Sequence, residues 1–246
     1  MKKFILSAVA ALCASAAMAA PVVTSGTLTR GQFEYVPTVT SNISAPVLSG
    51  FQNVYAGAMR FTFDGGLDVN NFPLFQSFLA FCIDLTSYAG AQGVGIVYDK
   101  VDFVNSLNPY DKIGKLITAN GGMASVDASG SAAMQLAVWN IMYDNDLTVD
   151  AGTFRALTNT GTDVNVKANA LLASANGLTQ SLYDVSLLSD NYNNKFGSKQ
   201  DYITASINPG FGCEEADACE IPEPGSFALA GLGLLGLCLT RRRKAT

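Results

Sequence analysis

Hydrophobic and polar residues alternate along the first part of this chain. Between residues 24 and 62, β-branched and aromatic residues alternate with polar ones, and proline and glycine interrupt the pattern repeatedly. This alternation predicts several short strands joined by turns. The segments 75–85 and 94–104 are denser in apolar residues and predict two more strands, of which the first is buried.

The period then changes to that of a helix. Apolar residues recur at helical spacing in 108–120, 129–143 and 164–175, and Asn-Gly pairs end the first and third segments. We expect three helices, of which 129–143 is the clearest, with Ser129 or Ser131 as its N-cap. The residues expected on the apolar face of that helix are Met134, Val138, Ile141 and Met142.

Alternation returns near the end of this region and indicates how the domain is built. The segment 200–207 alternates again and predicts a closing strand. Strands, then a block of helices, then a strand predict an α+β fold. We expect a β-rich scaffold, sandwich or barrel-like, with a helical insertion.

The N-terminus has the features of an export signal. Two lysines precede an apolar run over residues 4–17, and small residues stand at positions 17 and 19. This order predicts a signal peptide over residues 1–19, cleaved after Ala19. The apolar run is short for a membrane span, so a retained N-terminal anchor is the less favoured alternative.

The C-terminus carries a second processing signal. Pro222, Glu223 and Pro224 precede an uncharged apolar segment, 226–240, of marginal length for a transmembrane helix. A cluster of cations follows and is expected to stay cytoplasmic. Its arginines are Arg241, Arg242 and Arg243.

This tail, residues 221–246, resembles the PEP-CTERM sorting signal that exosortases recognise in Gram-negative bacteria. The resemblance implies processing by an exosortase-type protease near Pro222–Pro224. The protein would be anchored transiently in the inner membrane, through this tail alone, and then pass to the cell surface or extracellular matrix. An ordinary single-pass anchor is the alternative.

The remaining chain is an ectodomain over residues 20–208, followed by an acidic linker over 209–220. The chain has no histidine, which excludes Ser-His-Asp and Cys-His catalysis and the commonest zinc ligand. The formal net charge is −5 with no basic stripe, so we expect no nucleic acid partner. Residues 64–70 lack a complete calcium loop, and no carboxylates are recognisably paired. We expect no metal, no cofactor and no enzymatic activity.

The cysteines raise a question of pairing. Five are encoded, but Cys13 leaves with the signal peptide and Cys238 lies in the tail. Cys213 and Cys219 flank a short polar loop and are close enough for a local disulfide. Cys82 is then left over. It could pair with Cys213 or Cys219, or remain a free buried thiol.

Two segments resemble the paired motifs of bacterial thioester domains, which occur in surface adhesins. They are 81–85, Phe-Cys-Ile-Asp-Leu, and 134–139, Met-Gln-Leu-Ala-Val-Trp. In that family a cysteine after an aromatic residue joins a glutamine of a Gln-x-Ala-aliphatic-Trp motif through a side-chain thioester. The resemblance implies a thioester-domain-like fold.

The same resemblance implies roles for individual residues. Cys82 would supply the thiol and Gln135 the acyl group, while Ala137 and Trp139 would support the bond by packing. Met134 stands where the family often has threonine, but this position supplies no reacting atom.

Two functions remain open from the sequence. The first is a covalent surface adhesin whose thioester captures an amine or hydroxyl on a protein or polysaccharide. The alternative is a non-covalent structural protein of the exopolysaccharide or biofilm matrix, with Cys82 buried or in a disulfide.

Overall fold

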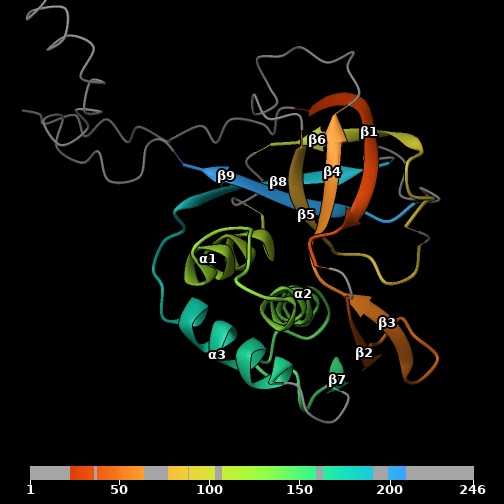
Figure 1. Ribbon diagram of the computed structural model, residues 1–246. Helices are drawn as coiled ribbons and strands as arrows, with labels where there is room; N and C mark the ends of the chain where they lie inside the picture. The colour runs from red at the N-terminus through yellow and green to blue at the C-terminus, as the bar shows by residue number, and fades with distance from the viewer. Residues whose placement is uncertain are drawn as a thin grey trace, which may run out of the picture. The chain divides into compact units, whose positions relative to one another are not determined.

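The computed structural model describes residues 23–35, 38–63, 77–87, 89–102, 107–158, 163–190 and 199–208. An antiparallel barrel forms one part of this region, and helices with a small sheet form the other (Figure 1). The strands are β1 (Val23–Phe33), β2 (Val39–Ser44), β3 (Gln52–Ala56), β4 (Met59–Phe63), β5 (Ser77–Cys82), β6 (Gly95–Val101), β7 (Arg155–Thr158), β8 (Tyr183–Ser189) and β9 (Tyr202–Ile207). The helices are α1 (Tyr110–Asn120), α2 (Ala128–Tyr143) and α3 (Val164–Asn176).

Six strands close into the barrel in the order β1-β4-β5-β9-β8-β6. Strand β9, the predicted closing strand, pairs with β5 on one side and β8 on the other. Aromatic rings fill the interior: Phe61 packs edge-on against Tyr98 and Tyr202, with ring centroids 6.3 Å and 4.9 Å apart. The predicted α+β fold with a barrel-like scaffold is confirmed, and the helices are inserted between β6 and β8.

A second sheet stands beside the barrel. Its three strands lie in the order β3-β2-β7 and are all antiparallel. Strand β7 crosses from the helical insertion to pair with β2, which ties the insertion to the N-terminal strands. The sequence pattern predicted neither β7 nor β8, because both are short or flanked by helical and polar segments that give no clear alternation.

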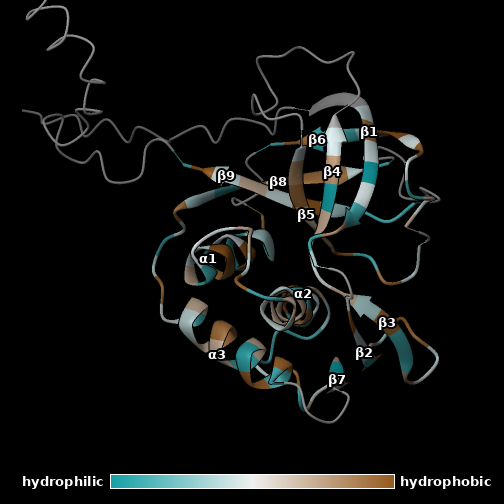
Figure 2. Ribbon diagram, viewed as in Figure 1, coloured by the Kyte–Doolittle hydropathy of each residue, from teal (hydrophilic) through white to brown (hydrophobic). Residues whose placement is uncertain are grey.

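Helix α2 lies at the centre of the helical part and is drawn end-on in Figure 1. It contacts α1 and α3 as well as β2, β3 and β5. Every residue from 131 to 141 is buried, so the helix has no solvent-exposed face over this stretch. Figure 2 shows a predominance of apolar residues in β5, whose end adjoins α2. Helix α2 is therefore buried on all sides over residues 131–141, and not only on the one apolar face expected from the sequence.

The N-cap of α2 differs from the prediction. Asp127 is the N-cap, and its carboxylate accepts a hydrogen bond from the backbone N–H of Gly130 at 2.6 Å. Ser131 is instead buried and donates to Glu34 at 3.0 Å. The short side chain of Asp127 reaches the exposed amides at the helix start.

Both processing segments lie outside the described residues. They are the predicted signal peptide, 1–19, and the sorting tail, 221–246, with its apolar segment 226–240. The linker 209–220, with Cys213 and Cys219, also lies outside the described residues. Within the part of the chain that the structure describes, none of the helices combines the length and apolar character needed to cross a bilayer.

Candidate functional site

Cys82 is the last residue of β5, at a point where the barrel loses one strand pairing. On one side Cys82 stands opposite Tyr202 of β9. On the other side the β4 pairing ends where Met59 meets Ala80, because the chain turns away at Gly57, whose φ is +149°. Backbone groups of successive strand residues point to alternate sides. The backbone N–H of Ile83 donates to the C=O of Asp201, on the side of β9. The backbone N–H and C=O of Cys82 therefore face the opposite side, where no strand pairs with β5.

Gln135 of α2 occupies that open position. The backbone N–H of Cys82 donates to Oε1 of Gln135 at 3.1 Å, and Nε2 of Gln135 donates to the backbone C=O of Cys82 at 2.7 Å. The carboxamide thus takes the place of the missing strand. Cys82 is 3% exposed and Gln135 is 1% exposed. The structure therefore brings together the two residues that the sequence motifs paired.

Three residues of α2 form one row against the Cys82 segment. Gln135, Trp139 and Tyr143 are spaced by four residues, which places them along one ridge of the helix. The hydroxyl of Tyr143 donates to the backbone C=O of Ile83 at 3.1 Å and accepts from the N–H of Leu85 at 3.0 Å. The helix therefore holds this segment at both ends. Sequence reasoning missed Tyr143, although its spacing from Gln135 was available as a signal.

The side chain of Cys82 is held in its protonated form. It donates to the backbone C=O of Asp84 at 2.8 Å, and it forms no disulfide within the described residues. Burial raises the pKa of this thiol far above its ordinary value, since desolvation disfavours the thiolate. The indole N–H of Trp139 has no hydrogen-bond partner among the described residues, and it lies near enough to the sulfur to oppose that rise in pKa in part.

A pocket of about 270 Å³ leads to this site. Cys82, Gln135 and Trp139 line it, and strand β3 contributes Asn53 and Tyr55 to its wall. Ala137 is fully buried and lies outside the lining, so its small side chain serves the packing of α2. The pocket gives a small molecule a route to two side chains that are otherwise closed to solvent.

Residues 220–244 match the PEP-CTERM protein-sorting motif. This match marks the protein as exported and sorted to the cell surface, with processing by an exosortase. It covers the tail that the sequence analysis assigned to sorting, including Pro222, Glu223 and Pro224.

Two solved structures are similar to this chain. The N-terminal thioester domain of a surface protein from Clostridium perfringens is similar, with a TM-score of 0.43 and 13% identity, covering 75% of this chain and 100% of that one. A cysteine-to-alanine mutant of a thioester domain from the same organism gives a TM-score of 0.37 and 10% identity, covering 70% and 100%. No curated protein matches the sequence.

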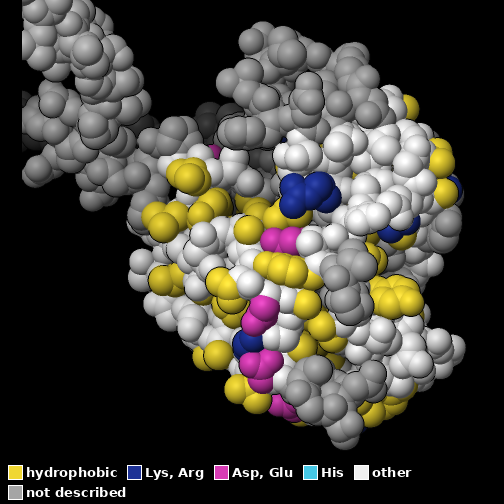
Figure 3. Space-filling model, viewed as in Figure 1, with side chains coloured by type: hydrophobic (Ala, Val, Ile, Leu, Met, Phe, Trp, Pro, Cys, Tyr) yellow, Lys and Arg dark blue, Asp and Glu magenta, His cyan; other side chains and the backbone are white. Residues whose placement is uncertain are grey.

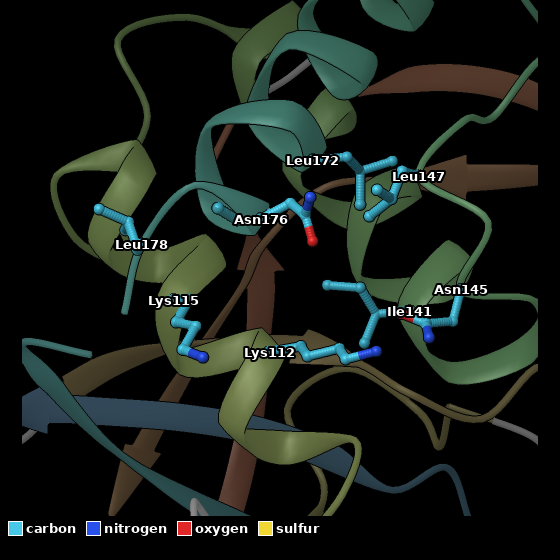
Figure 4. Close-up of a pocket in the computed structure, with 9 residues that line it drawn as sticks. Lys112, Lys115, Ile141, Asn145, Leu147, Leu172, Asn176 and Leu178 are labelled. Atoms are coloured by element: carbon cyan, nitrogen blue, oxygen red, sulfur yellow. The ribbon is translucent and has the colours of Figure 1, made fainter. Parts of the chain in front are cut away.

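Other regions of the exported protein give less indication of a functional site than this pocket does. A cavity of about 70 Å³ between the helices is lined by two lysines, two asparagines and apolar residues, and the lysines are Lys112 and Lys115 (Figure 4). Charged side chains are few on the face drawn in Figure 3, and acidic and basic ones are intermixed. No group of His, Cys, Asp or Glu in the described part of the chain is arranged to hold a metal ion.

Proposed function

We propose that this exported surface protein is a covalent adhesin that uses an internal thioester between Cys82 and Gln135. The observation that carries the proposal is the Gln135 carboxamide, held by two hydrogen bonds on the backbone of Cys82 at the floor of a pocket. The side chains are unlinked in the structure, so bond formation requires the thiol to rotate away from Asp84. The resemblance of residues 81–85 and 134–139 to thioester-domain motifs supports the same pairing.

Formation of the bond needs close and rigid placement, because an amide is a poor electrophile. The sulfur of Cys82 attacks Cδ of Gln135, the C–S bond forms and the C–Nε2 bond breaks. The thiol proton passes to the departing nitrogen, which leaves as ammonia. Rigid placement of two groups can supply an effective concentration on the order of 10⁵ M or more. Strand β5 and the buried helix α2 are suitable mounts, and Tyr143 fixes the strand end between them.

The backbone N–H of Cys82 has a second role in this chemistry. It already donates to Oε1 of Gln135, the oxygen that gains negative charge when the carbonyl carbon is attacked. A fixed donor in a buried site stabilises that charge more than water does. The same donor would polarise the thioester carbonyl afterwards and prepare it for the incoming nucleophile.

Capture of a target reverses the roles of sulfur and nitrogen. An amine or hydroxyl of the target enters the pocket and attacks Cδ of residue 135, and the C–S bond breaks. The proton of the nucleophile passes to the sulfur. Burial raises the pKa of Cys82, so the departing sulfur accepts that proton readily. The product is an amide or ester to residue 135 and a free thiol. Each molecule reacts once, so the protein is not an enzyme.

Methylamine tests this proposal through two linked readouts. The untreated protein should have no alkylatable thiol at Cys82, and methylamine should release one while adding a methylamide at residue 135, located by peptide mapping. The Gln135→Glu variant retains a carbonyl oxygen but cannot lose ammonia, and it should show an alkylatable thiol without treatment. An untreated protein whose Cys82 is fully alkylated after unfolding would reject the thioester.

A second candidate is a non-covalent structural protein of the exopolysaccharide or biofilm matrix. The observation in its favour is that both Gln135 amide groups and the Cys82 thiol have hydrogen-bond partners without any covalent bond. In that case Gln135 serves only to complete the barrel edge. Cys82→Ser would then alter stability and leave attachment unchanged.

The path to the surface belongs to the same proposal. Cleavage near Pro222–Pro224 would release the ectodomain from a transient anchor over 226–240 in the inner membrane of a Gram-negative cell. Arg241, Arg242 and Arg243 would hold the end of that anchor on the cytoplasmic side.

A further inference from the structure

Arg30 stands out in the wall of the pocket above Cys82. It is the one charged residue among the described residues that line the pocket of about 270 Å³. It also lines an adjoining hollow of about 550 Å³, again as the one charged lining residue. Phe33 and Tyr55 are shared by both. The two hollows therefore adjoin at Arg30, Phe33 and Tyr55, and the smaller one reaches Cys82.

The guanidinium of Arg30 has no anionic partner within the described part of the chain. Nη1 donates to the sulfur of Met59 at 3.5 Å, which is a weak acceptor, and Nε is buried without a hydrogen bond. Each of the ion pairs found among the described residues involves a lysine. A carboxylate of a ligand would satisfy the buried Nε–H and pair with the charge. Its flat fork of donors matches a carboxylate.

The rest of the wall suits a sugar ring. Phe33 and Tyr55 lie with ring centroids 6.1 Å apart, and Tyr55 is 66% exposed. An exposed aromatic face packs against the C–H face of a sugar ring. The exposed amides of Asn53 and Gln92 supply donors and acceptors for sugar hydroxyls. The inner pocket is slightly smaller than the ~300 Å³ at which drug-sized sites begin, which fits one ring better than several peptide residues.

We infer that the pocket recognises a carboxylate-bearing sugar, such as a uronic acid unit of a polysaccharide. Its carboxylate binds Arg30, its ring packs on Tyr55, and one of its hydroxyls points to the carbonyl carbon of Gln135. This assignment deepens the proposed function, since it names the class of acceptor. Reversible recognition at Arg30 itself requires no thioester.

The test separates recognition from covalent chemistry by using the Cys82→Ala variant. Binding of D-glucuronate, D-glucose and acetate to this variant is measured by NMR titration. Glucuronate should bind more tightly than either of the others. Arg30→Gln should weaken glucuronate binding by roughly tenfold to a hundredfold, the usual loss for hydrogen bonds to a charged group. Arg30→Lys should recover only part of it, because lysine lacks the fork.

Arg155→Gln is the matched control. Arg155 is exposed on β7, packs over the ring of Phe51 at 5.4 Å and lies outside both hollows, so binding should be unchanged. Equal binding of glucuronate and glucose would overturn the inference, as would equal effects of the two arginine variants. Acetate binding as tightly as glucuronate would overturn the sugar assignment. A thioester that reacts with methylamine while Arg30→Gln changes nothing would overturn this inference and leave the proposed function intact.

Discussion

The carboxamide of Gln135 bonds both backbone groups of Cys82, at 3.1 Å and 2.7 Å, where β5 has no strand neighbour. This relationship ties the barrel to the buried helix α2. It also places the carbonyl of Gln135 against an N–H donor and beside the thiol-bearing residue. One side chain thus supports the fold and, in our proposal, supplies the acyl group.

Gln135→Ala should destabilise the protein even where no thioester can form. In the Cys82→Ala background it leaves a buried N–H and a buried C=O without partners, which should cost about 2–4 kcal/mol. Urea unfolding measures this loss. Gln92→Ala, at an exposed glutamine, should change stability by less than about 0.5 kcal/mol. Equal losses in the two variants would show that the Gln135 hydrogen bonds contribute nothing to folding.

Tyr143→Phe should loosen the segment that follows Cys82. The hydroxyl bonds Ile83 and Leu85, and its removal should cost about 1–3 kcal/mol. Amide hydrogen exchange should show loss of protection at Leu85. Tyr183→Phe is the comparison, because the bond from its hydroxyl to the C=O of Gly121, at 3.3 Å, is exposed to solvent and should matter less. Unchanged exchange at Leu85 would contradict the bracing role of Tyr143.

Asp127→Ala should destabilise α2 more than Ser129→Ala. Asp127 accepts the capping hydrogen bond from Gly130, so its loss should cost about 1 kcal/mol, with a range of ~0.5–2. Ser129 makes no cap to the helix backbone and donates to Asp127 instead. Thermal unfolding of the two variants at one pH decides the order. A larger loss of stability in Ser129→Ala would support Ser129 as the N-cap, one of the two serines predicted from the sequence.

Asp201→Asn should change the pH dependence of stability. Burial raises the pKa of Asp201 to about 6 from its usual ~3.9, so the folded state holds the proton more tightly than the unfolded state. The contribution of Asp201 is therefore most favourable below pH 4 and declines as pH rises through 6. The variant should gain stability relative to the native protein between pH 4 and pH 7.

Asp163→Asn provides a control of opposite sign. The hydrogen bond from Lys167 holds the pKa of Asp163 below its usual value, so its contribution is present above that value and is lost as pH falls. This variant should be more destabilised at pH 7 than at pH 3, as measured by urea unfolding. The same pH trend in both variants would contradict the assigned environments.

Local patterns along the chain predicted the main elements of the fold. Alternation predicted several short strands in the region of β1 to β4 and the closing strand β9, and dense apolar segments predicted β5 and β6. Helical spacing with Asn-Gly endings predicted α1 and α3. The pattern missed β8 and also β7, which has only four residues and is held by pairing with β2. It also gave α2 only one apolar face, because Gln135 and Asn140 are polar although both are buried. The Gln135 amide bonds Cys82, and Nδ2 of Asn140 donates to Asp146 and to the C=O of Thr148. Such contacts leave no periodic trace in the sequence.

The sequence predicted the part of the candidate site that lies in local motifs. The motifs named Cys82, Gln135 and Trp139, and all three line one pocket. No local pattern indicated Arg30, which comes from β1 and reaches the pocket only through closure of the barrel. Residues that meet through long-range strand pairing cannot be grouped from spacing alone.

The intact mass of the purified protein tests the central claim most directly. We predict a mass lower by one ammonia than the processed sequence requires, while Cys82→Ala has the full mass of its own sequence. A native protein with the full mass, and with Cys82 present as a free thiol or in a disulfide, would contradict the thioester.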